Sequence, residues 1–167
     1  TCRRVSKDSR KINDGNSLAR FSIAVFNDCH RWGIPAVIEN PHSSRLWCLE
    51  SFRQARRQRN VEWIWTDFCQ DSTPWLKRTA FLSTHLDFGP HAVSAVQLAM
   101  RTCCARCVCT RTGRSHQLLQ GVQPSSGRFF TIRAEPYPKQ LCKRMQQLFI
   151  MTRSWRLQAL PLHLLDS

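Results

Sequence analysis

The feature that most constrains the fold is an alternation of helical and extended patterns along residues 16–84. Apolar side chains recur at steps of three and four residues between Asn16 and Trp32, which predicts a helix with one buried stripe. Gly33 stands where a helix C′ residue belongs, and Pro35 follows it. The buried stripe is expected to consist of Leu18, Phe21, Val25 and Cys29. Residues 1–15 are basic and polar, and Asp14-Gly15 is a turn signal.

Three short segments downstream have the composition of strands, and they cover residues 34–38, 61–68 and 80–84. Ser43 or Ser44 can cap a helix over residues 44–59. Its apolar face would contain Leu46, Leu49, Phe52 and Ala55. Helix, strand, helix, strand, loop, strand is typical of α/β folds with buried strands. We expect one sheet containing the strands that end at Glu39, Phe68 and Thr84, the first two parallel and joined by a right-handed crossover.

The composition changes after about residue 88 and divides the chain into three parts. Residues 1–88 are expected to form the α/β part. Residues 89–150 combine a short helix over 91–100, a Cys- and Arg-rich irregular segment and a last amphipathic helix. The apolar face of that helix would contain Leu141, Met145, Leu148 and Phe149. Residues 151–167 are interpreted as a tail.

The charge balance indicates a polyanionic partner. The chain has 25 Lys and Arg residues against 11 Asp and Glu residues, a formal net charge of +14. Nucleic acid is the first expectation, DNA ahead of RNA, and an anionic membrane surface is the alternative. The excess also fits a piece of a longer chain whose acidic counterpart lies elsewhere.

Cysteine usage and hydropathy bear on the compartment. No segment approaches the roughly 18 apolar residues of a membrane span, and the N-terminus leads into no signal peptide. The nine cysteines are odd in number and unevenly spaced, which does not fit a secreted disulfide framework. We therefore expect an intracellular protein, nuclear or cytoplasmic, with no membrane partner.

Four cysteines gather between residues 103 and 109. Cys104 and Cys107 form a Cys-x2-Cys pair, and Cys109 and His116 complete the donors that a tetrahedral zinc ion requires. Cys103 is left as a spare thiol in this interpretation. The alternative is a set of free thiols in a basic loop, whose flanking arginines would favour the thiolate form.

A second basic group follows the predicted strand-to-helix turn. Arginines at positions 53, 56, 57 and 59 lie close in sequence to Trp47, Trp63 and Trp65. Basic groups near aromatic rings suit phosphate contact with base stacking. A solvated helix face beside a tryptophan-rich core explains the same pattern and is favoured slightly.

The run from Ala36 to Trp47 carries the most chemical information. An apolar strand places Glu39 and Asn40 at its carboxyl end, where open α/β sheets bind ligands. A glutamate there can bond both the amino group and the ring nitrogen of a base, and can share a proton with that nitrogen when burial raises its pKa. The alternative is a loop glutamate followed by an Asx-type turn.

This run resembles motif VI of the C5-cytosine DNA methyltransferases, in the Glu-Asn-Pro variant of phage-type and mobile-element enzymes. The surroundings agree in order, with Cys29-His30-Arg31-Trp32-Gly33-Ile34-Pro35 before it and Phe68-Cys69-Gln70 after it. The segment Pro74-Trp75-Leu76-Lys77-Arg78-Thr79 is similar to the counterpart of motif VIII. The tail of the variant group resembles residues 109–116, 133–138 and 141–142. The resemblance covers roughly residues 12–145.

The resemblance implies a methyltransferase-type, partly Rossmann-like sheet and methyl transfer from S-adenosyl-L-methionine to carbon 5 of cytosine. Glu39 takes the catalytic, base-binding role by position, and Lys77 falls where the standard motif VIII has its middle Arg. The other substrate-binding residues carried over are Asn40, Pro41, Ser43, Arg45, Gln70 and Arg78. Trp75 and Thr79 stand where the standard motif has Gln and its last Arg, so those contacts are not carried over.

Two family features have no counterpart before Glu39: the Gly-rich cofactor loop and the Pro-Cys nucleophile. We therefore expect the C-terminal part of a catalytic domain, inactive and unable to bind S-adenosyl-L-methionine tightly without a missing N-terminal half. The alternative, of a different class, is a non-enzymatic, basic nucleic-acid-binding module with a zinc site. A third possibility is a degenerate mobile-element fragment.

Overall fold

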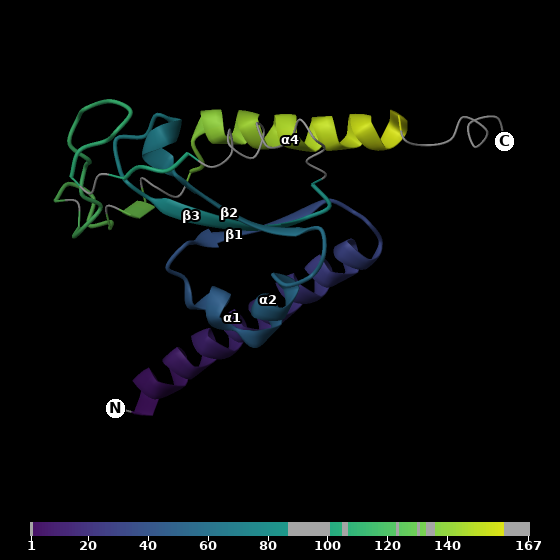
Figure 1. Cartoon of the computed structure of the whole chain (residues 1–167). Helices are drawn as coiled ribbons and strands as arrows, with labels where there is room; N and C mark the ends of the chain where they lie inside the picture. Colours follow the sequence, from purple (N-terminus) through teal and green to yellow (C-terminus); the bar gives the residue numbers. More distant parts are fainter. Residues whose placement is uncertain are drawn as a thin grey trace.

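A computed structural model of the chain describes residues 2–86, 101–104, 107–122, 124–129, 131–132 and 136–158, with side chains described from residue 9 to residue 150 of these. The elements in chain order are α1 (Cys2–Arg31), β1 (Ala36–Pro41), the 3-10 helix η1 (Arg45–Cys48), α2 (Glu50–Ala55), β2 (Val61–Asp67), the 3-10 helix η2 (Phe68–Asp71), β3 (Arg78–Thr84) and α4 (Lys139–Gln158) (Figure 1). The helix expected over residues 91–100 lies outside the described residues.

The three strands form one sheet, as expected from the sequence. Their order, which was not predicted, is β1-β3-β2. Both pairings are antiparallel, with Ala36 opposite Thr84 in the first and Val61 opposite Thr84 in the second. Because β1 and β2 each run against β3, they run in the same direction as one another, but they are not neighbours. β3 is the central strand, and every residue in it after Arg78 is buried.

Helices cover both faces of the sheet (Figure 1). On one face, α1, η1 and α2 pack against β3 in a core that includes Phe26, Trp47, Phe52 and Leu82. On the other face lies α4, whose Leu141 packs against Phe68 and Phe81 and whose Leu148 packs against Ile64. The chain is therefore a mixed α/β protein with a small antiparallel sheet between helices.

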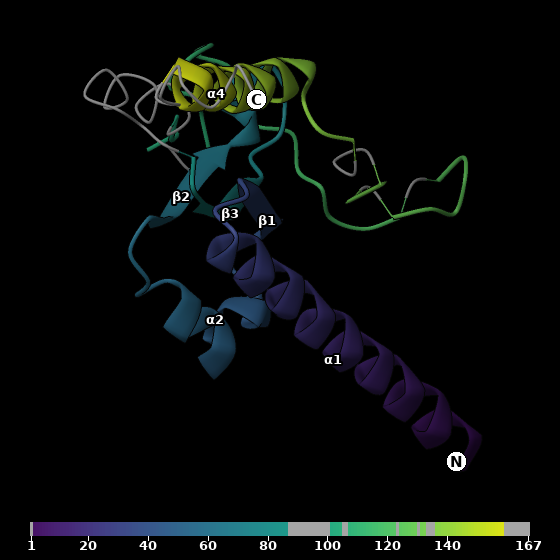
Figure 2. The same ribbon diagram turned by 90° about the vertical axis from the view of Figure 1, so that its right-hand side faces the viewer.

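The first helix begins earlier than predicted and buries a different face. α1 runs through Asp14-Gly15 without a break, in a part of the helix that projects away from the sheet (Figure 2). Its buried residues are Ile23 and Phe26, with Ala19 packed against them. The predicted stripe is wrong: exposed fractions of 66%, 67% and 44% are found for Leu18, Phe21 and Val25.

The end of α1 confirms the prediction for Gly33. This residue has a φ of 66°, and its N–H bonds the carbonyl of His30 at 3.2 Å. The N–H of Ile34 bonds the carbonyl of Cys29 at 2.8 Å. The two bonds form a Schellman motif, which requires the left-handed conformation that glycine adopts without strain.

The helix predicted over residues 44–59 is two short helices. The hydroxyl of Ser44 accepts the N–H of Leu46 at 3.2 Å and caps η1. Leu49 then has an extended backbone, with a ψ of 137°, and separates η1 from α2. Leu49 is exposed as a result, whereas Phe52 and Ala55 are buried as predicted.

The last helix confirms the predicted apolar face at Leu141 and Leu148, and Met145 is half-buried, but the prediction is wrong for Phe149, which is exposed. α4 continues to Gln158, eight residues into the segment interpreted as a tail. Among the helices that the structure describes, none combines the length and the apolar character needed to cross a membrane.

Candidate metal centre

Four metal-binding side chains meet beyond the end of β2: Cys69, Cys103, Cys109 and His116. Their ligand atoms all lie within 4.8 Å of one another, and Cys103 Sγ lies 3.7 Å from His116 Nε2. Ligands at 2.0–2.3 Å from a tetrahedral zinc ion would be about 3.5–3.8 Å apart. The three thiols are buried and the imidazole is half-buried. The donor set and its spacing therefore fit a structural zinc ion.

The polypeptide brings the first two ligands together through β2. Cys69 lies in η2, which continues directly from the strand. The carboxylate of Asp67, fully buried at the strand end, accepts the N–H of Cys103 at 2.7 Å. Arg78 holds that carboxylate with two hydrogen bonds of 2.9 and 2.8 Å. The hydroxyl of Thr66 also donates to the carbonyl of Arg101 at 3.0 Å.

The other two ligands lie on a tight turn. An antiparallel bridge pairs Val108 with Ser115 on either side of it. The N–H of Cys109 bonds the carbonyl of Arg114 at 2.8 Å, and the N–H of Gly113 returns to the carbonyl of Cys109 at the same distance. Gly113 has a φ of 66°, so this turn favours glycine. This turn brings the side chains of Cys109 and His116 together at the cluster.

Polar groups surround the sulfur atoms. The amide of Gln70 lies 3.6 Å from Cys69 Sγ and 3.8 Å from Cys109 Sγ. The N–H and the hydroxyl of Thr110 each lie 3.5 Å from Cys103 Sγ. Donors of this kind stabilise thiolate ligands and fix their orientation.

Without a metal, the thiols differ in acidity. Burial raises the pKa of Cys69 to about 12, and the neighbouring Cys103 adds to the effect. Burial acts in the same direction on Cys109, but the backbone N–H groups of Arg111 and Thr112 and the hydroxyl of Thr112 outweigh it and lower its pKa to about 6. Cys109 therefore ionises before Cys69, and a bound metal would displace the protons that remain on the ligands.

The predicted ligand set needs a correction at two of its four positions. Cys109 and His116 belong to the cluster, but Cys104 and Cys107 are exposed and lie outside it. Cys103, interpreted as a spare, and Cys69, which was not considered as a ligand, take their places. Cys69 precedes Cys103 by 34 positions, so no local spacing could reveal it.

The structure separates the predicted substrate-binding residues. Ser43 and Arg78 line one pocket of about 550 Å³, together with His42, Asp67 and Cys103. Gln70 belongs to the metal centre instead. The remaining predicted residues lie elsewhere. Asn40 is half-buried in β1, and the carbonyl of Pro41 accepts the indole N–H of Trp47. Arg45 is exposed in η1, and the ammonium group of Lys77 lies 4.6 Å from the ring centroid of Phe68.

Glu39 lies on the α4 face of β1, and hydrogen-bond donors bind both of its carboxylate oxygens. Thr79 donates its hydroxyl to Oε1 at 2.9 Å, and Tyr137 donates its phenolic O–H to Oε2. Burial and the bond to Glu39 raise the pKa of Tyr137, so the tyrosine remains a donor at neutral pH. Tyr137 was not predicted as a site residue, although its segment was noted.

The arginines at positions 53, 56, 57 and 59 are exposed, and Arg56 also contacts an aromatic ring of the core. The guanidinium of Arg56 lies 4.0 Å from the ring centroid of Trp63. The ring of Trp47 also contacts Trp63, edge to face, with 4.5 Å between the two ring centroids. This arrangement agrees with the favoured interpretation of a basic helix face beside a tryptophan-rich core.

Comparison of the chain with protein-family models, with curated proteins and with solved structures found no match.

Proposed function

We propose that this chain is a nucleic-acid-binding module whose basic loop, residues 101–117, is held on the α/β scaffold by a zinc ion. The observation that carries the proposal is the meeting of Cys69, Cys103, Cys109 and His116 within 4.8 Å. Four protein ligands fill a tetrahedron, which is the arrangement of a structural site rather than a catalytic one. The net charge of +14 supports a polyanionic partner.

The zinc ion would close a long loop. It would join η2 to the turn that carries Cys109, Arg111 and Arg114, and so fix two cationic side chains relative to the sheet. Because this loop has few buried apolar groups among its described residues, metal binding is expected to supply much of its stability.

The metal site is tested by titrating the reduced chain with Co²⁺ and recording the visible and near-ultraviolet spectrum. We expect the bands of tetrahedral thiolate coordination at one equivalent. Cys103→Ser and His116→Ala should weaken binding by at least tenfold, while Cys107→Ser, at an exposed cysteine close by, should not. The proposal would be contradicted if Cys107→Ser weakened Co²⁺ binding as much as Cys103→Ser, or if no tetrahedral spectrum appeared.

Nucleic-acid binding is tested by fluorescence anisotropy with a labelled 20-base-pair duplex and its single strand, using the zinc-loaded chain. Affinity should fall steeply with salt, with a slope of log K against log[salt] of about −0.9 for each phosphate neutralised on a duplex. No binding at 50 mM salt, or a flat salt response, would exclude this function.

A second candidate rests on Glu39. The chain would then be the C-terminal part of a DNA cytosine-5 methyltransferase-like domain, with β1, β2 and their helical connection forming part of a Rossmann-like sheet. The support is the position of Glu39 near the end of β1, beside the donors Thr79 and Tyr137. Because α1 fills residues 2–31, this stretch has no strand-to-helix cofactor loop, and S-adenosyl-L-methionine and the nucleophile would depend on a further polypeptide segment.

This candidate predicts recognition of an unpaired cytosine without methyl transfer. A duplex with cytosine opposite an abasic site should bind more tightly than one with thymine there, and Glu39→Gln should remove the difference. Glu62→Gln on β2 is the matched control. Equal affinity for the two duplexes, or incorporation of labelled methyl groups by this chain alone, would contradict it.

A further inference from the structure

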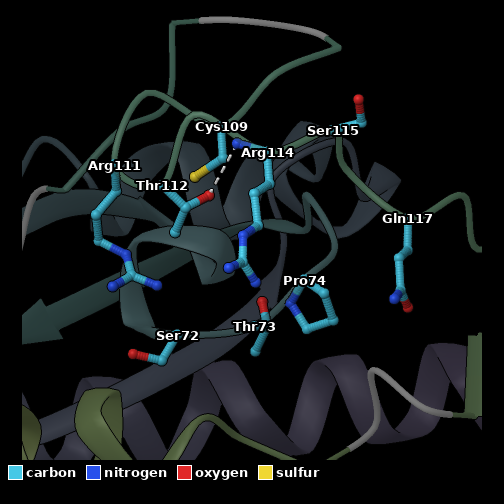
Figure 3. A pocket seen from close by; sticks show the side chains of 9 residues that line it. All are labelled: Ser72, Thr73, Pro74, Cys109, Arg111, Thr112, Arg114, Ser115 and Gln117. Carbon is cyan, nitrogen blue, oxygen red and sulfur yellow. Dashed lines mark hydrogen bonds between the residues drawn. The ribbon is translucent and has the colours of Figure 1, made fainter.

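A pocket of about 310 Å³ lies beside the metal centre (Figure 3). The turn that carries Cys109 forms one wall, and the segment after η2 forms the other. Most of the residues that line it are cationic or hydroxylic; the others are Pro74, Cys109 and Gln117, and no carboxylate is among the lining residues. The cationic and hydroxylic residues are Arg111, Arg114, Ser72, Thr73, Thr112 and Ser115.

Two guanidinium groups face the same space in this pocket. Arg111 donates its Nε–H to the carbonyl of Cys69 at 3.1 Å, which fixes the side chain and leaves its terminal nitrogens outside that bond. The backbone of Arg114 is fixed by the bond from Cys109 and by a 3.3 Å bond from its own N–H to the hydroxyl of Thr112. Figure 3 shows both side chains extending from the turn toward Ser72 and Thr73.

Asp71, which precedes Ser72 in the sequence, has another arginine as its main partner. Its buried carboxylate is bound by Arg144 of α4 at 2.5 Å. Burial raises the pKa of that carboxylate, and Arg111 lowers it through charge alone and less than Arg144 does. Two cations held in one small space repel each other unless an anion lies between them. Guanidinium groups and hydroxyl donors together match the oxygen atoms of a phosphate group.

The size of the pocket limits the ligand. A volume of about 310 Å³ is at the lower end for small-molecule sites, which span roughly 300–1,000 Å³. It accommodates a phosphate group with part of its sugar, while the rest of a polymer would pass along the surface. Ser72 has a φ of 75°, a strained conformation for a residue with a Cβ, and such strain is often retained at binding sites.

We propose that this pocket binds one backbone phosphate of a nucleic-acid strand between Arg111 and Arg114. The inference rests on the proposed nucleic-acid-binding function and adds the place where the strand is held. The metal centre would keep the two arginines in position, because Cys109 and His116 lie on either side of them in the sequence.

The test compares Arg114→Gln with Arg59→Gln, a matched change at an exposed arginine outside the pocket, by anisotropy with the labelled 20-base-pair duplex. Arg114→Gln should weaken binding five- to tenfold at 100 mM salt and reduce the salt slope by about 0.9. Arg59→Gln should change the slope by less than half of that. Equal effects of the two variants, or no effect of Arg114→Gln while the unmodified chain binds, would overturn the pocket but leave the proposed function intact. No binding by the unmodified chain would reject both.

Two further measurements separate folding from binding and identify the source of the phosphate. The Co²⁺ spectrum of Arg114→Gln should match that of the unmodified chain; if it does not, Ser72→Asp replaces it, since aspartate tolerates a positive φ and places a negative charge in the pocket from the opposite wall. Ser72→Asp should weaken duplex binding at least as much. Inorganic phosphate should compete only at millimolar concentration; tight phosphate binding that the duplex does not displace would assign the pocket to a free anion and overturn the proposal.

Discussion

Phe26 and Phe21 provide a direct test of which face of α1 packs on the sheet. Phe26 is 1% exposed and lies in the core beneath β3, whereas Phe21 is 67% exposed. A fully buried phenylalanine removes about 150–250 Å² from water, which at about 25 cal/mol per Å² corresponds to roughly 4–6 kcal/mol. Measured truncations of buried aromatic residues cost about 3–5 kcal/mol. We therefore expect Phe26→Ala to lower the free energy of unfolding by about 3–5 kcal/mol.

The same change at Phe21 should have a small effect. Only about a third of its side chain is covered, which limits the lost burial to roughly 1–2 kcal/mol. Alanine recovers about 0.5 kcal/mol through its higher helix propensity. Phe21→Ala should thus stay within about 1.5 kcal/mol of the unmodified chain.

The assay is urea unfolding of the zinc-loaded chain followed by tryptophan fluorescence, with the slope m compared between variants. A constant m allows the shift in midpoint to be converted to free energy. If Phe21→Ala destabilised the chain as much as Phe26→Ala, the stripe of Leu18, Phe21 and Val25 would be the packed one, and the assignment of the helix face would be refuted.

Two further predictions concern buried charge and pH. Arg144→Met should lower the free energy of unfolding by about 3–5 kcal/mol in the same assay, because it removes the cation that binds the buried carboxylate of Asp71. Lys143→Met, on the exposed side of α4, should leave the free energy of unfolding nearly unchanged. For His30, burial and the neighbouring His85 lower the pKa below 6.5, so the unfolded chain binds more protons and stability should fall as the pH decreases below about 6.5. His30→Gln should reduce this loss of stability at low pH. If the pH dependence of the unfolding midpoint were the same in His30→Gln as in the unmodified chain, His30 would not be its source.

Local patterns in the sequence were sufficient to place the strands and the end of α1. The glycine at position 33 is required by the helix terminus itself, so its role does not depend on tertiary structure. The face of α1 could not be chosen in this way. The stripe through Leu18 and Phe21 and the stripe through Ile23 and Phe26 both have helical spacing, and only contacts with the sheet decide between them.

The ligands of the metal centre also depend on tertiary contacts that local sequence patterns do not show. The spacing of Cys104 and Cys107 satisfied a local rule, yet the structure uses cysteines that lie on different elements. Cys69 reaches the cluster because β2 leads into η2, and Cys103 reaches it because the buried carboxylate of Asp67 binds its backbone. Neither condition is visible before the strands are assembled.

The central position of β3 has a consequence for the order in which the chain can fold during synthesis. Each strand pairing in the described sheet involves β3, which is the last of the three strands to be translated. The 43 residues between the end of β1 at Pro41 and the end of β3 at Thr84 take about 2–9 s to translate at roughly 5–20 residues per second. Until β3 has been made, neither β1 nor β2 has its native pairing partner. A released chain that ends before Arg78 would therefore leave β1 and β2 without their native partner, and a single further segment of seven residues would allow both to pair.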